Sequence, residues 1–227
     1  MQKNIWEREY RERKDLPSTR TREPSRVLVW YIENFVETGK VTPGSALDIG
    51  SGFGRNSIHL AKRGYDVVGV EIVRDAIETA GKEAEKAGVA HRVRFVEKNV
   101  GEPLSLEDAS FDLIIDMMTM HSLNREERAA HAQNVVRLLK PNGHFLFYTI
   151  FADSPDAKEL FNTSPGPELN SYIIPQTGAV EKAFTKDELT HIFSPLIVVE
   201  LEIKSESIRA FDKVYDRQFL LGVMGKG

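Results

Sequence analysis

Three glycines follow a short apolar run early in the chain, and two carboxylates lie close to them. The run Ala46–Ile49 is typical of a strand, and Gly50, Gly52 and Gly54 form the turn after it. Glycine adopts positive φ readily and lets the backbone approach a ligand closely. A ligand held by such a turn sits beyond the carboxyl end of the strand. The pattern therefore predicts a small-molecule site at this turn.

The carboxylates narrow the choice of ligand. Asp48 precedes the first glycine, where it would repel the pyrophosphate of a dinucleotide but would suit a cationic amine. Glu71 ends the next predicted strand, where an acid accepts hydrogen bonds from ribose hydroxyls. Arg55 stands where the dinucleotide pattern G-x-G-x-x-G needs its third glycine. A ligand with an amino acid group near Asp48 and a ribose near Glu71 fits S-adenosylmethionine.

Four segments strengthen this interpretation. They are Leu47–Gly54, Val68–Glu71, Phe111–Asp116 and Leu138–Gly143. In order and spacing they resemble the landmarks of class I S-adenosylmethionine-dependent methyltransferases of the small-molecule type, over residues 45–150. The resemblance implies an α/β fold: a Rossmann-like, doubly wound, seven-stranded sheet, mostly parallel, with a reversed C-terminal strand.

The resemblance also implies a set of cofactor-binding residues. The glycines would lie against the methionine part, with Asp48 near its amine or orienting the turn. Glu71 would hold the ribose, Ile72 would cover one adenine face, and Asn99 stands where the family usually has an acid. The implied set is Asp48, Gly50, Ser51, Gly52, Gly54, Glu71, Ile72, Asn99, Val100, Asp116 and Met117.

His121 is the candidate catalytic residue, because it follows the fourth strand at the mouth of the expected pocket. Methyl transfer from a sulfonium depends mainly on holding the acceptor in line with it. A general base is needed only if the acceptor must lose a proton. A structural histidine bonded to neighbouring backbone explains the same position, so both interpretations of His121 stay open.

The methyl acceptor is expected to be a small, partly apolar molecule. Trp6 and Tyr10 are similar to the W-x-x-x-Y arm of small-molecule methyltransferases, although they also suit a helix packed on the body. Tyr148 and Tyr172 complete the predicted acceptor or lid set. The chain lacks the Asp/Asn-Pro-Pro-Tyr/Phe segment used for nitrogen acceptors in DNA, RNA and proteins. The alternatives are a protein or RNA acceptor, a non-catalytic S-adenosylmethionine-binding module, and an NAD(P)-dependent oxidoreductase.

Composition supports a cytoplasmic globular enzyme. The 227 residues carry a net charge of −4 and include no cysteine, so disulfides, thiolate metal sites and cysteine nucleophiles are excluded. No apolar run approaches the ~20 residues that cross a membrane, and no metal site is predicted. The first 26 residues are basic, with eight Lys/Arg against five Asp/Glu, but no nucleic-acid motif accompanies them. The oligomeric state is left open between monomer and homodimer.

The whole chain, 1–227, is expected to form one domain. Its parts are an arm and helix (1–40), a cofactor-binding core (45–151), a lid or acceptor-side insertion (152–183) and a C-terminal helix with strands (184–227). Capping boxes at Asn124 and Thr185 predict helices to Leu139 and Phe193. In the stretch 152–180 the apolar residues show no sustained helical or strand periodicity. Predicted strands are Ser45–Ile49, Asp66–Glu71, Val93–Glu97, Phe111–Met117, His144–Phe151, Leu196–Ile203 and Phe219–Met224.

Overall fold

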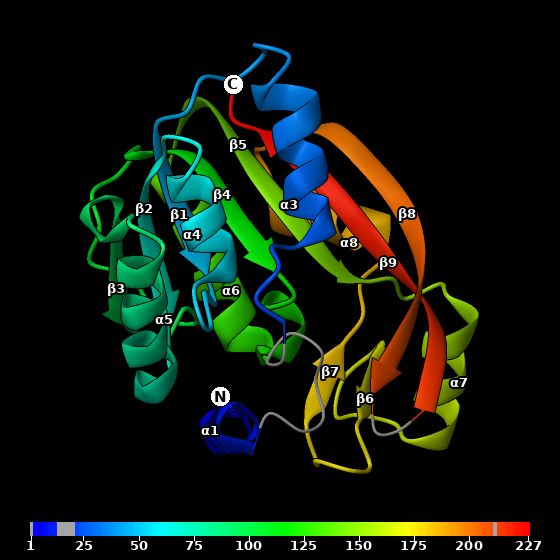
Figure 1. The fold of residues 1–227 in the computed structure, drawn as a ribbon. Coiled ribbons are helices and arrows are strands. Elements are labelled where there is room, and N and C mark those ends of the chain that lie inside the picture. Colours follow the sequence, from blue (N-terminus) through cyan, green and yellow to red (C-terminus); the bar gives the residue numbers. More distant parts are fainter. Residues whose placement is uncertain (1, 13–20, 211–212) are drawn as a thin grey trace.

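A computed structural model describes residues 2–12, 21–210 and 213–227. Seven strands form one sheet in the order β3-β2-β1-β4-β5-β9-β8 (Figure 1). β1 to β5 are parallel, and β9 runs antiparallel between β5 and β8. The predicted seven-stranded sheet with a reversed C-terminal strand is therefore confirmed. The strands are β1 (Ser45–Ile49), β2 (Asp66–Glu71), β3 (Val93–Glu97), β4 (Phe111–Met117), β5 (Leu139–Ile150), β8 (Ile197–Ala210) and β9 (Lys213–Gly225).

Helices cover both faces of the sheet because its central strands are apolar on both sides. Alternate residues of β4 belong to two different cores: Leu113 and Ile115 to one, Ile114 to the other. The first core holds α3 (Arg26–Tyr31), its π-helical continuation η1 (Ile32–Val36) and α4 (Arg55–Ala61), with Ala84 of α5 (Arg74–Lys86). The second holds α6 (Arg125–Leu138) and α8 (Lys186–Ile192). Because β1, β2 and β4 are parallel, the turns that follow them lie together at the carboxyl ends of the strands (Figure 1).

The capping box predicted at Asn124 is confirmed, whereas only the Thr185 half of the second one forms. Asn124 and Glu127 form the complete capping box that begins α6. Thr185 accepts from the backbone N–H of Glu188 at the start of α8, but the Glu188 carboxylate pairs with Lys182 at 2.9 Å. α6 ends at Leu138, and β5 begins at the next residue, earlier than the predicted His144.

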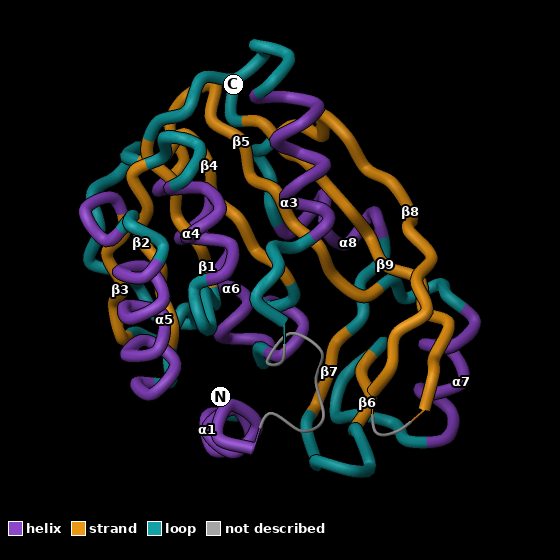
Figure 2. The backbone as a smooth tube through the Cα atoms, in the orientation of Figure 1, coloured by secondary structure: helices purple, strands orange, loops and turns teal. Residues whose placement is uncertain are grey.

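The segment 152–183 is more regular than its sequence suggests. It contains α7 (Pro155–Thr163), which begins at a Ser154 cap with proline in the first turn, and a two-stranded hairpin, β6 (Ser171–Ile173) with β7 (Val180–Lys182). α7 and the hairpin lie beside the far ends of β8 and β9, which extend beyond the predicted limits (Figure 2).

The helix α1 (Lys3–Glu12) lies at the carboxyl edge of the sheet (Figure 1). Gln2, just before the helix, ties it to β7 by two hydrogen bonds between its side-chain amide and the backbone of Val180. The amide nitrogen donates to the Val180 carbonyl at 2.7 Å, and the amide oxygen accepts from the Val180 N–H at 2.6 Å. The same nitrogen donates to the carbonyl of Ser122 at 3.1 Å, in the short helix η3 (Met120–Ser122). Within the described ranges, no helix combines the length and apolar character needed to cross a membrane.

Candidate active site

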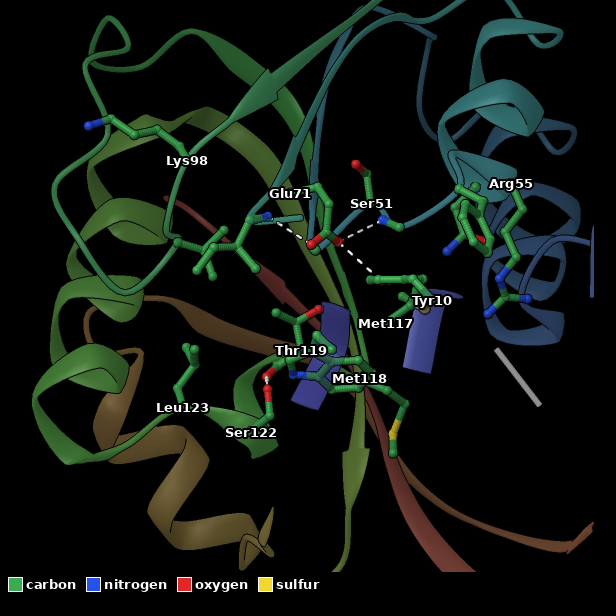
Figure 3. Close-up of a pocket in the computed structure, with 17 residues that line it drawn as sticks. Tyr10, Ser51, Arg55, Glu71, Lys98, Met117, Met118, Thr119, Ser122 and Leu123 are labelled. Atoms are coloured by element: carbon green, nitrogen blue, oxygen red, sulfur yellow. Dashed lines mark hydrogen bonds between the residues drawn. The ribbon is translucent and has the colours of Figure 1, made fainter. Parts of the chain in front are cut away.

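A pocket opens at the carboxyl ends of β1, β2 and β4, where α1 covers it (Figure 3). It contains about 810 Å³ of space that no atom fills, including its solvent-open mouth. Its walls are Trp6, Tyr10, Gly50, Ser51, Gly52, Phe53, Arg55, Asn56, Glu71, Ile72, Lys98, Val100, Met117, Met118, Thr119, Ser122 and Leu123.

The three glycines of the turn perform different tasks. All have positive φ, between +54° and +76°. A Cβ on Gly50 would lie 2.1 Å from Oγ1 of Thr119, so this glycine lets the loops after β1 and β4 meet. A Cβ on Gly54 would lie 2.7 Å from the Phe95 ring, which makes Gly54 a packing residue at the start of α4, off the pocket wall. Gly52 faces the pocket, where a Cβ would meet the Tyr10 hydroxyl at 3.0 Å.

Glu71 is the most connected side chain of the pocket. Its Oε1 accepts from the N–H groups of Ile72 and Val73 at 2.7 and 3.0 Å, just before α5 begins. Its Oε2 accepts from the N–H of Gly52 at 3.0 Å and from the Tyr10 hydroxyl at 3.2 Å (Figure 3). Burial raises the pKa of Glu71, and these hydrogen bonds only partly oppose the shift. The carboxylate thus ties β2 to the glycine turn and borders the pocket.

The arm contributes two aromatic rings, one helical turn apart, to the wall of the pocket. The Trp6 and Tyr10 ring centroids lie 6.1 Å apart, and Tyr10 meets Phe53 edge-on at 5.0 Å. Burial, followed by the charge of Glu71, raises the pKa of Tyr10 well above its usual value. The phenol therefore stays protonated and donates to Glu71.

Asp48 lies behind the turn, off the pocket wall. It is fully buried and accepts from the Ser57 hydroxyl at 2.6 Å. Burial raises its pKa to about 6, although Ser57 and Arg55 oppose the shift. Of the two roles proposed from the sequence, orienting the turn fits this geometry, and direct contact with the amine does not.

Asp116 also lies elsewhere than expected. Its side chain is fully buried and points into the turn after β4, where it accepts from the N–H groups of Thr119 and Met120. Its Oδ2 lies 2.6 Å from Nε2 of His131 on α6. The carboxylate therefore shapes the loop that carries Met118 and Thr119, both on the pocket wall, and does not itself border the pocket.

Of the residues predicted to contact the adenine, Ile72 and Val100 line the pocket but Asn99 does not. Lys98, which the sequence argument missed, also lines the pocket. Asn99 turns away from the pocket: its Oδ1 accepts from the N–H of Gly101 at 2.8 Å, and its amide donates toward Glu102 at 3.3 Å. Its side chain is satisfied by the Gly101 backbone and by the Glu102 and Glu127 carboxylates, so it shapes the loop after β3.

The two tyrosines proposed for the acceptor side are core residues. The Tyr148 ring stacks on Phe219 with centroids 4.8 Å apart. Tyr172, in β6, is buried and donates a hydrogen bond to Glu181 of β7. Neither lines the pocket.

His121 is close to the pocket but faces its neighbour. The ring lines a second, smaller cavity, and its Nε2 lies 3.5 Å from Oε1 of Glu181. Ser122, the next residue, lines both cavities, as does Trp6. Glu181 has no motif around it in the sequence, so pattern reasoning could not have found this pair.

The pocket suits a ligand with an amino acid part and a ribose. The Ser51 hydroxyl is buried and lacks a hydrogen-bond partner among the described residues, and Arg55 supplies a cation. Burial lowers the pKa of Arg55, while Asp48 and Tyr10 oppose that shift. Glu71 adds a carboxylate at the other side of the turn.

Comparison with known proteins agrees with this geometry. Residues 46–143 match a family described as "Methyltransferase domain". Residues 46–143 belong to the class I S-adenosylmethionine-dependent methyltransferases. Members of this family use S-adenosylmethionine as their cofactor.

One relative of this methyltransferase domain is the 2-heptyl-1-hydroxyquinolin-4(1H)-one methyltransferase of Mycobacteroides abscessus. It is 31% identical over 51% of this chain and 49% of its own length. The chain spans about half the length of the first curated relatives it matches. The fold is shared with a methyltransferase structure from Methanosarcina mazei, at 22% identity and a TM-score of 0.73, covering 84% of this chain and 96% of that one. It is also shared with the 1,6-didemethyltoxoflavin-N1-methyltransferase of Burkholderia thailandensis, whose structure holds 1,6-didemethyltoxoflavin and S-adenosylhomocysteine (20% identity, TM-score 0.63, 89% and 77% covered).

Proposed function

We propose that this protein transfers a methyl group from S-adenosylmethionine to a small-molecule acceptor. The observation that carries the proposal is the cradle around Gly52. Three groups line one cavity: the buried acid at the end of β2, the cation of Arg55, and the buried Ser51 hydroxyl, which has no hydrogen-bond partner in the described part of the chain. The bound cofactor supplies a methyl group already activated by a positively charged sulfur. The residues of the chain have to bind it, hold the acceptor in line and keep water out.

Individual roles follow from the position of each residue. Glu71 accepts hydrogen bonds from the ribose hydroxyls, Ser51 and Arg55 contact the amino acid part, and Ile72 and Val100 pack on the adenine. Met117 and Met118 follow the end of β4 and belong to the pocket wall. Asp48 and Asp116 act indirectly, because each shapes a loop that lines the pocket.

Two observations favour a small acceptor over a protein or RNA. The arm helix α1 covers the pocket and is anchored to the β6–β7 hairpin through Gln2, so little room is left for a macromolecular chain. The Mycobacteroides abscessus and Burkholderia thailandensis proteins are named for small ring compounds. Both observations support an acceptor enclosed between the arm and the segment 152–183.

Binding and transfer experiments test the proposal together. Calorimetry should detect S-adenosylmethionine and S-adenosylhomocysteine binding, and no binding of NADH or NADPH. Transfer of a radiolabelled methyl group should then be measured with small-molecule extracts, total protein and RNA as acceptors. Label in the small-molecule fraction supports the proposal. Label only in protein or RNA contradicts the small acceptor, and tight binding without transfer to any fraction indicates a non-catalytic module.

A further inference from the structure

The loop after β4 supplies one side of the cofactor pocket. Together with the last residue of the strand it contributes Met117, Met118, Thr119, Ser122 and Leu123 to the wall (Figure 3). These residues lie close together in the chain, so a single change in the loop backbone would move several of them at once. The shape of the pocket therefore depends on what holds this loop.

Met118 has a backbone conformation that its own side chain opposes. Its φ is +68°, in the left-handed region, where the Cβ of an L-residue crowds the following carbonyl oxygen. Glycine enters this region freely, but methionine does not. A residue in such a conformation persists only where its surroundings impose it, and such residues cluster at ligand sites. Contacts outside Met118 must therefore hold it in place.

Asp116 provides the main restraint. Its Oδ1 accepts from the N–H of Thr119 at 2.8 Å, and its Oδ2 accepts from the N–H of Met120 at 3.1 Å. The N–H of Met118 itself donates to the carbonyl of Tyr148 at 3.0 Å. The peptide groups on both sides of Met118 are thus fixed by hydrogen bonds.

Thr119 carries the same restraint to the glycine turn. Its hydroxyl donates to the carbonyl of Ile49 at 2.9 Å, in the space that the missing side chain of Gly50 leaves open. The loop after β4 and the turn after β1 therefore contact each other directly. A shift of Thr119 would disturb both walls of the pocket.

His131 is the residue that keeps Asp116 in this orientation. It lies on α6, its side chain is 1% exposed, and its Nε2 donates to Oδ2 of Asp116 at 2.6 Å. The rings of Phe145 and Phe193 meet the imidazole edge-on, with centroids 6.4 and 6.0 Å away, which fixes its direction. A buried carboxylate that loses its partner is strongly destabilised where it stands. Without the imidazole, Asp116 would turn toward other donors and release the loop.

On the basis of the proposed cofactor role of this pocket, we propose that His131 is a positioning residue for S-adenosylmethionine. Its imidazole holds Asp116 in the orientation that keeps Met118 left-handed and the loop against the cofactor. His131 does not line the pocket itself, so it acts only through Asp116. Loss of the imidazole lets Met118 relax to negative φ, and cofactor affinity falls although every residue of the wall is unchanged.

Calorimetry with S-adenosylhomocysteine is the first test, at a temperature where circular dichroism shows each variant to be folded. His131→Leu should weaken binding about 5- to 30-fold, which corresponds to the strain of one left-handed residue with a Cβ. His131→Gln should bind nearly as well as wild type, because its amide nitrogen reaches about as far as Nε2 and also donates. Val135→Ala truncates a buried side chain one turn further along α6 and should lower stability but not affinity.

Changes at Met118 separate positioning from a general loss of stability. Glycine takes positive φ without strain, so in a Met118→Gly background the further change His131→Leu should alter affinity little. Alanine also lacks the long side chain but still opposes the left-handed conformation. In a Met118→Ala background His131→Leu should therefore keep its full effect. Each double variant is compared with its own Met118 parent, which cancels the direct contribution of the methionine side chain to binding.

Amide hydrogen exchange gives a measurement that needs no ligand. The N–H groups of Thr119 and Met120 donate to Asp116, so they should exchange faster in His131→Leu and at the wild-type rate in His131→Gln. If His131→Leu does not fold, His131→Asn replaces it, because the shorter amide does not reach Asp116.

Equal affinity of wild type and a folded His131→Leu or His131→Asn protein overturns the inference. An equal loss of affinity in the Met118→Gly and Met118→Ala backgrounds also overturns it, because His131 would then act independently of the strain. Wild-type protein that binds no S-adenosylhomocysteine would instead overturn the proposed function. The exchange rates of Thr119 and Met120 would still show whether His131 holds the loop.

Discussion

Glu71 both holds the glycine turn in place and faces the cofactor pocket, so its removal should have two separable effects. In Glu71→Ala the N–H groups of Gly52, Ile72 and Val73 lose their acceptor, which should lower the free energy of unfolding by about 1–3 kcal/mol. Loss of the bonds to ribose should weaken S-adenosylmethionine binding by about 2–4 kcal/mol. Chemical denaturation and calorimetry measure the two effects on one sample.

Glu78→Ala provides the matched control for Glu71, because Glu78 is exposed on α5 and pairs with Arg74 at the surface. It should behave as wild type in both measurements. Unchanged cofactor affinity in a folded Glu71→Ala protein would remove Glu71 from the binding site and leave it a purely structural residue.

Asp48 should make the fold less stable as pH rises toward neutrality. Burial raises its pKa from 3.8 to about 6, so between these values the folded state holds a proton that the unfolded state has lost. Stability from this group is therefore full below pH ~4, decreases up to pH ~6 and is constant above, a change on the order of 3 kcal/mol. Denaturation from pH 4 to 7 should show a smaller fall in stability for Asp48→Asn than for wild type, and the difference between the two curves isolates Asp48 from other buried acids such as Glu71. Parallel curves would show that Asp48 does not titrate in that range.

The arm helix α1 should respond to the cofactor as a unit. Trp6 and Tyr10 already line the pocket, so a bound ligand adds contacts to the same face of the helix. Amide hydrogen exchange of residues 2–12 should slow on addition of S-adenosylhomocysteine. Gln2→Ala releases α1 from Val180 and Ser122 and should speed exchange in the free protein. Equal exchange with and without ligand would identify α1 as a static part of the fold.

Local sequence signals predicted the elements that depend on local chemistry. The glycine turn, the strand ending at Glu71 and the capping box at Asn124 lie where the pattern placed them. The segment 152–180 did not reveal α7 or the β6–β7 hairpin, because these are stabilised by packing on β9 and by the side chain of Gln2. Such contacts leave no periodic pattern in the segment itself.

The same distinction applies to the site. Ser51 and Gly52 of the glycine turn and Glu71 at the end of β2 were predicted from the sequence pattern, and all three line the pocket. Asp116 and Tyr172 do not, because each is captured by a partner distant from any motif: His131 for Asp116, and Glu181 for Tyr172. A spacing rule fixes where a backbone goes, whereas the direction of a polar side chain depends on which buried partner it meets.

Cofactor binding should be measurable as a change in the stability of the whole molecule. A ligand that binds only the folded state at 100 times its dissociation constant adds about 2.7 kcal/mol. For a protein of this size that corresponds to a rise in Tm of about 5–11 °C. S-adenosylhomocysteine should produce this shift in a thermal melt, and NADH at the same concentration should not. A shift with NADH alone would contradict the assignment of the pocket.

The position of β9 in the sheet has a consequence for how the protein is made. β5 pairs from His144 to Ile150 with β9, which begins only at Lys213. A ribosome delivers the chain from its N-terminus, so β1 to β5 emerge well before the strand that closes the open side of β5. During that interval the nascent chain exposes a row of unpaired backbone groups to other chains in the crowded cell. Translation speed between Phe151 and Lys213 should therefore influence the yield of folded protein, and a chaperone that shields this edge would raise it.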